Sequence, residues 1–142
     1  MTDKITDDEH SALIESVQED LPRDVTAHRD GLGLNDMIKI YADERDHDNG
    51  NTSHDYNLRL NDNLVGELHF QHGPRNEPGS LPGLTDESIL AVAIDRLRGF
   101  QSGPYSCREN AIALTKLEEA LHWLQSRAKA RAARGVLGKR ER

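Results

Sequence analysis

One amide side chain marks a candidate binding site because it continues a predicted apolar helix face. The face consists of leucines at alternating steps of three and four residues: Leu114, Leu117, Leu121 and Leu124. Extended toward the N-terminus, the same face reaches Asn110. Because an amide buried without a partner costs about 1–3 kcal/mol, we expect Asn110 to hydrogen-bond to protein or to a ligand.

Three further residues are candidates for contacts to a ligand. Phe100 ends the preceding predicted helix, where its ring either packs in the core or stacks on a base, a contact worth about 1–3 kcal/mol. Arg75 and Asn76 follow a Gly-Pro turn in the run FQHGPRNEPG, residues 70–79. An arginine beside a rigid turn suits a phosphate group, so a structural role for the turn does not account for these two residues.

Catalytic and metal chemistry are less well supported. The four histidines near the predicted sheet lack the paired spacing of zinc motifs, so we expect no metal: His47, His54, His69 and His72. Cys107 has no histidine or aspartate placed to make a catalytic set, and we expect it, like Trp123, to be a packing residue. No cofactor motif is present, and none is expected.

A helical hairpin over residues 81–136 must position Phe100 and Asn110. Thr85 is the expected cap of its first helix, whose apolar stripe ends at Phe100. Gly103-Pro104 then reverses the chain. Ser106 and Glu109 have the spacing of a capping box, so a second helix should start near Cys107 and end at Gly135.

The earlier part of the chain predicts a small antiparallel β-sheet over residues 36–80. Residues 37–41 read as a strand, and alternating segments on both sides of residues 61–63 read as a β-hairpin. Residues 1–35 form an acidic extension, with a weak helix over 7–20 and a linker from 23 to 35. Residues 137–142 form a basic tail. The predicted fold class is therefore α+β.

Composition limits the function further. The 142 residues are 35% hydrophobic and 4% aromatic, which is a low apolar content for the core of a monomer. Burial of apolar surface between subunits would therefore help to stabilise the fold. A net charge of −7 argues against general nucleic-acid binding. The single cysteine excludes an internal disulfide, and no apolar run is long enough for a signal peptide or a membrane span. We expect a cytoplasmic protein, in the host cell if a phage encodes it.

The chain resembles a known family in two runs: FQHGPRNEPG and FQSGPYSCRENAIALTKLEEALHWLQSRAKARAARGV, the latter beginning at Phe100. Both are similar to the phage Thoeris anti-defence proteins of the Acb/Tad helical-hairpin group, over residues 36–136. That resemblance implies a non-enzymatic sponge that sequesters nucleotide signals of bacterial immunity. It implies that Phe100, Asn110 and Arg127 hold a cyclised ADP-ribose, and that Arg75 and Asn76 hold the cyclic di- or trinucleotides of CBASS immunity.

Spacing adds a constraint on the first of these sites. Asn110 and Arg127 stand 17 positions apart, which is about 25 Å along one helix and about 100° around its axis. One small ligand cannot touch both within a single chain. We therefore expect a two-fold dimer in which two such helices run antiparallel, and the resemblance implies assembly of dimers into a hexamer.

Two other functions remain open on the sequence alone. An enzyme that cleaves a nucleotide signal could assemble its site from separate segments, although no phosphate-cradling loop or catalytic pair is visible. A small DNA-binding or adaptor protein could use the basic residues after Arg127, although the acidic net charge disfavours it.

Overall fold

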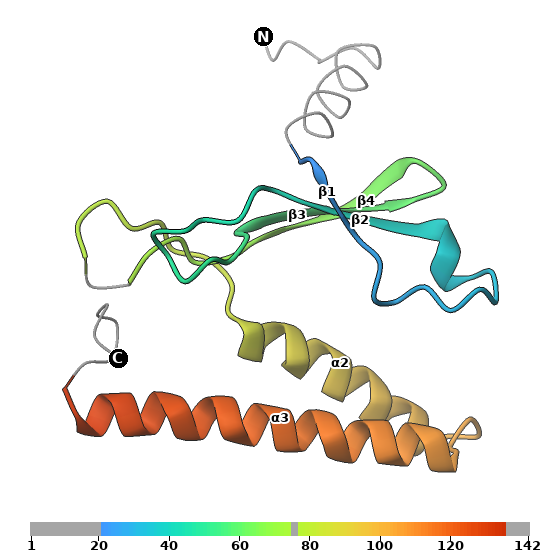
Figure 1. Ribbon diagram of the computed structural model, residues 1–142. Coiled ribbons are helices and arrows are strands. Elements are labelled where there is room, and N and C mark those ends of the chain that lie inside the picture. The colour runs from blue at the N-terminus through green and yellow to red at the C-terminus, as the bar shows by residue number, and fades with distance from the viewer. Residues whose placement is uncertain (1–20, 75–76, 136–142) are drawn as a thin grey trace, which may run out of the picture. The chain divides into compact units, whose positions relative to one another are not determined.

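The computed structural model describes residues 21–74 and 77–135, which belong to two compact units divided between Phe70 and Gln71 (Figure 1). The first unit contains a four-stranded antiparallel sheet, and the second contains two helices. This combination confirms the predicted α+β fold. The predicted helix over 7–20 and the tail at 137–142 lie outside the described residues. No helix in the described ranges is long and apolar enough to cross a membrane.

The strands of the sheet lie in chain order, and each pairs with its neighbour: β1 (Arg23–Val25), β2 (Ile38–Ala42), β3 (Asp55–Leu60) and β4 (Asn63–His69). A short 3-10 turn, η1 (Asn35–Met37), leads into β2. The predicted linker over 23–35 is wrong at its start, because it contains β1. Three residues are too few to show an alternating pattern, and β1 is held by its backbone pairing with β2.

The β3–β4 hairpin closes where the sequence predicted it. Its two turn residues, Asn61 and Asp62, have φ angles of 47° and 68°. These left-handed conformations suit asparagine and aspartate, and they match the twist of paired strands. The register shifts between Leu58 and Arg59, opposite the segment that contains Gly66. A bulge of this kind lets the ladder bend without losing its pairing.

The helices are α2 (Asp86–Gln101) and α3 (Arg108–Ala133). Thr85 caps α2 as predicted, in a capping box with Ser88. The predicted cap of α3 by Ser106 and Glu109 is wrong by one position. Cys107 is the cap, because its Sγ accepts a hydrogen bond from the backbone N–H of Asn110 at 3.4 Å.

Gln101 explains why the second helix begins there. Its Nε2 donates to the Cys107 carbonyl at 3.1 Å, and its Oε1 accepts from the Cys107 N–H at 3.0 Å. Gln101 therefore holds both backbone groups of Cys107, whose carbonyl also accepts the first hydrogen bond of α3 from the Ala111 N–H at 3.1 Å. Cys107 is also exposed, so it closes a turn and is not the packing residue that we expected. At the far end, Gly135 has a φ of 73° and ends α3 as predicted.

The core of the hairpin is thin. Among the described residues of the whole chain, the buried apolar side chains are few: Leu21, Ala42 and Ile94. The leucine face of α3 is only half-buried, and none of its 26 residues is fully buried. Because α2 has 16 residues, it is about 15 Å shorter than α3. Figure 1 shows the red end of α3 reaching past α2.

A polar side chain lies buried in the middle of the sheet. Asn57 on β3 is fully buried, between Tyr41 of β2 and Glu67 of β4 in the strand register. Neither its Oδ1 nor its Nδ2 makes a hydrogen bond with any residue of the described ranges. An amide buried in this way lowers stability, since it has lost water without gaining a partner.

We therefore expect Asn57→Val to raise the free energy of unfolding by about 1–2 kcal/mol, because valine removes the unpaired amide and favours a strand. Urea denaturation would measure the change. The same substitution at exposed Asn63 of β4 is the control and should change stability by no more than about 0.5 kcal/mol. A loss of stability in Asn57→Val would contradict the interpretation.

Candidate functional site

The structure brings two of the predicted site residues to one end of the hairpin. Phe100 lies in the last turn of α2, and its side chain is 42% exposed. Asn110 lies in the first turn of α3, where it is half-buried. Only the short loop of residues 102–107 separates the two helices. Phe100 and Asn110 therefore lie on adjoining helix ends that the Gln101 contacts hold together.

Asn110 has an available side-chain amide. Its backbone N–H is used by the Cys107 cap, but its side chain makes no hydrogen bond with the described parts of the chain. It continues the half-buried face that Leu114 and Leu117 begin. An amide at the end of an apolar face has both a donor and an acceptor for a ligand.

Arg127 lies far from this end. It is on the same helix, α3, so the 17-residue separation does correspond to about 25 Å along a continuous axis. Within one chain the structure does not bring Arg127 to Asn110. Its side chain is exposed and forms no ion pair with the described residues. It is available for an anion.

The face of α3 that carries Arg127 also carries two exposed apolar side chains. Ile112 and Trp123 fall within about 60° of Arg127 around the helix axis, and they are 43% and 65% exposed. Trp123 makes an edge-to-face contact with His122, with 5.7 Å between the ring centroids. The expected packing role of Trp123 is therefore wrong for a single chain, because most of its surface remains open.

A depression of about 300 Å³ opens beside Phe100. It is lined by residues from the end of α2 and the following loop: Arg96, Gly99, Phe100, Gly103, Pro104 and Tyr105. The Arg96 guanidinium carbon lies 5.9 Å from the centroid of the Phe100 ring, within cation–π range. Sequence analysis did not single out Arg96 or Tyr105 as lining residues. The four-residue spacing from Arg96 to Phe100 does place these two on one helix face.

The second candidate site remains a prediction. Arg75 and Asn76 lie outside the described residues. The turn that precedes them is ordered by Gln71, whose Nε2 donates to the Gly73 carbonyl at 3.1 Å. Gln71 and Gln101 thus occupy equivalent places in the two FQxGP runs, and each binds the loop that follows it.

Comparison with known proteins confirms the predicted resemblance. Residues 67–129 match the family model described as Acb2/Tad1, hairpin domain. Thoeris anti-defense 1 of Bacillus phage SBSphiJ7 is 48% identical to this chain over 78 residues, which are 55% of this chain and 54% of that protein. The chain therefore spans about half the length of the curated relative it matches. The matched segment includes Phe100, Asn110 and Arg127.

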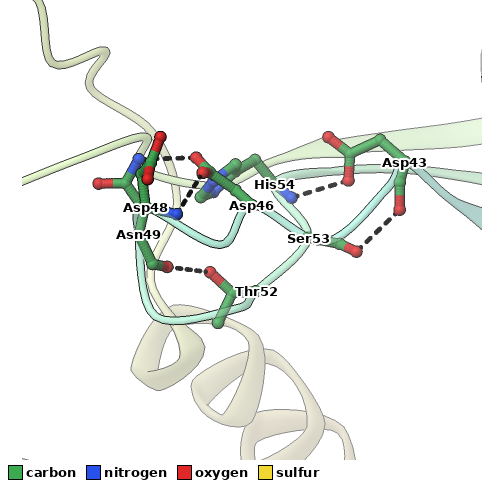
Figure 2. A network of polar contacts seen from close by, with 7 residues as sticks. All are labelled: Asp43, Asp46, Asp48, Asn49, Thr52, Ser53 and His54. Carbon is green, nitrogen blue, oxygen red and sulfur yellow. Dashed lines mark hydrogen bonds and ion pairs between the residues drawn. The ribbon is translucent and has the colours of Figure 1, made fainter.

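The sheet unit holds a separate polar network in the loop between β2 and β3 (Figure 2). The His54 ring is buried, and its Nε2 lies 3.0 Å from Oδ2 of Asp46. Asp43 accepts from the His54 N–H through Oδ1, and its carbonyl accepts from the Ser53 hydroxyl. Asp46 also accepts from the side-chain amide of Asn49 at 2.6 Å. These contacts show that the predicted polar loop is ordered, with a structural use for His54.

His69 lies at the end of β4 between two carboxylates. Its Nδ1 is 2.8 Å from Oδ1 of Asp55, and its Nε2 is 3.4 Å from Oε2 of Glu67. The hydrogen bond to Asp55, followed by that to Glu67, raises the pKa of His69 above the ordinary histidine value. The His69 ring therefore links β4 to Asp55 of β3, and protonation of the ring strengthens this link.

We expect an NMR titration to give His69 a pKa above that of an unstructured histidine peptide, and Asp55→Asn to bring it down again. Since the folded-state pKa is raised, the stabilisation is fully present below the unfolded histidine pKa of about 6.5 and is lost as the pH rises through the folded-state value. A His69 pKa at or below the peptide value would contradict a bridging role for the ring.

Proposed function

We propose that this chain, whose residues 67–129 match the Acb2/Tad1 hairpin domain, is a phage anti-defence protein that sequesters a cyclised ADP-ribose immune signal. The observation that carries the proposal is a pair of open polar groups on one helix. The Asn110 amide and the Arg127 guanidinium have no hydrogen-bond or ion-pair partner among the described residues, and each has the chemistry to bind part of a nucleotide.

The binding pocket in this proposal forms between two copies of the chain. If α3 of one copy runs antiparallel to α3 of another, Asn110 of one lies beside Arg127 of its partner. Two-fold symmetry then gives two equivalent pockets. The same arrangement covers the exposed Ile112 and Trp123 side chains, which lie on the Arg127 face. Burial of a large apolar side chain supplies about 1.5–3 kcal/mol toward association.

A pocket shared by two chains suits a protein that holds its ligand tightly. A sponge must lower the free signal below the level that its effector needs, and nanomolar affinity corresponds to about −12 kcal/mol. A few contacts on an open surface rarely supply that much after the entropy of association is subtracted. Enclosure by Phe100 and Asn110 of one chain and Arg127 of the other gives more contacts on more sides of the ligand.

Binding without turnover is consistent with the residue types. The side chains of phenylalanine and asparagine have no group that titrates near neutral pH, and arginine stays protonated. None of the three residues is therefore a good general acid or base. An enzyme that cleaves the signal is the alternative, and a DNA-binding or adaptor protein is disfavoured by the net charge of −7.

Two parts of the proposal rest on the family resemblance alone. One is the assembly of dimers into a hexamer. The other is a second site in which Arg75 and Asn76 bind cyclic di- or trinucleotides.

Sequestration and cleavage can be separated in one experiment. The protein is incubated with cyclic ADP-ribose, the bound fraction is isolated, and the protein is then denatured by heat. We expect the released nucleotide to be chemically intact by mass spectrometry and liquid chromatography. Recovery of an opened or hydrolysed product that a heat-killed control does not form would contradict sequestration.

Substitution should separate binding residues from neighbours. We expect Phe100→Ala, Asn110→Ala and Arg127→Ala each to weaken binding of cyclic ADP-ribose about tenfold or more in calorimetry, because each removes a stacking or polar contact worth about 1–3 kcal/mol. Lys129→Ala is the control, since Lys129 is also exposed on α3 but points about 160° away from Arg127. Equal losses in the control would contradict a specific site.

A further inference from the structure

The depression beside Phe100 combines two aromatic rings and a cation in a small space. Phe100 is 42% exposed and Tyr105 is 75% exposed, and both line it together with Arg96. Exposed aromatic rings lose favourable burial unless something covers them. Stacking on a planar base would cover them, since every base has an aromatic face.

Arg96 keeps its charge available. Its guanidinium lies over the Phe100 ring, and it forms no ion pair with a carboxylate in residues 21–74 or 77–135. Its neighbour Arg98 differs, because Arg98 pairs with Glu118 of α3 at 3.6 Å. Two arginines on the same helix therefore have different roles: Arg98 links the helices, and Arg96 faces the depression.

Gly99 adds an independent observation. It lies in the last turn of α2, where glycine favours the helix less than alanine does. A Cβ built at this position would meet no atom within 4 Å beyond its two chain neighbours and the adjacent backbone of the helix, so packing within the chain does not require a glycine. Gly99 does line the depression, and a methyl group there would occupy part of its volume. A glycine that the fold does not need, in the wall of an open depression, indicates a close approach by a ligand.

We propose that Arg96 and Tyr105 are ligand-binding residues, and that the depression takes the base of a nucleotide with its adjacent phosphate. The base stacks against the rings of Phe100 and Tyr105, and the phosphate lies at the Arg96 guanidinium. The inference rests on the proposed function, and it deepens it by assigning one part of the ligand to one part of the hairpin.

Calorimetry with cyclic ADP-ribose and the full chain tests the two side chains. Arg96→Gln and Tyr105→Ala should each weaken binding by about ten- to a hundredfold, since each removes a charged or a stacking contact. Arg98→Gln is the matched control and should bind within about twofold of the wild type, because Arg98 does not line the depression.

Gly99→Ala separates ligand binding from folding. The substitution should raise the melting temperature, because alanine favours the helix and meets no atom of the chain. It should also weaken binding of cyclic ADP-ribose, because the methyl group fills the depression. A protein that is more stable and binds less tightly cannot be explained by damage to the fold. Wild-type affinity in Arg96→Gln, Tyr105→Ala and Gly99→Ala together would overturn the inference and leave the proposed function standing.

A failure of the wild type to bind cyclic ADP-ribose would contradict the proposed function instead. In that case ADP serves as the probe, observed by NMR at the Arg96 side-chain Nε–H and the Tyr105 ring. Saturable shifts at both groups, with the Trp123 indole unchanged, would support a base-and-phosphate site in the depression. An absence of shifts at Arg96 and Tyr105 would overturn the inference on its own.

Discussion

The length of one helix constrains where a shared ligand can bind. α3 runs without interruption from Arg108 to Ala133, and a helix cannot fold back to bring its two ends together. Asn110 and Arg127 are thereby fixed about 25 Å apart in every copy of the chain. Any pocket that uses both must take them from different chains. A ligand that contacts both residues therefore requires assembly, because a monomer contains only separate parts of the proposed site.

The thin core of the hairpin also favours assembly of two chains. Ile94 is its one fully buried apolar residue among those described, while Trp123 leaves about two thirds of its surface exposed. A second copy that covers the Arg127 face would bury this surface. Because a ligand held between two chains binds only the assembled form, it would also stabilise that assembly. A chain with a weakly packed core can therefore still belong to a dimer that binds its ligand tightly.

The sequence predicted the regular elements better than the details of the site. The leucine spacing, the Thr85 cap and the Asn61-Asp62 turn each depend on local chemistry, and the structure confirms them. The strand β1 was missed because its order comes from pairing with distant residues. Cys107 replaced Ser106 as a cap because the Gln101 side chain holds its backbone, a contact that local spacing does not reveal. Arg96 and Tyr105 were missed for a related reason, since a depression depends on how the loop folds.

The most direct test of a pocket shared between chains is complementation of two inactive variants. Asn110→Ala and Arg127→Ala are each prepared alone and then co-expressed, so that mixed dimers form. Each variant alone should bind cyclic ADP-ribose weakly, because every pocket lacks one residue. In a mixed dimer one pocket keeps both residues, so tight binding should return at about a quarter of the wild-type number of sites for random pairing. If co-expression restores no tight sites although mixed dimers are present, the shared pocket is contradicted.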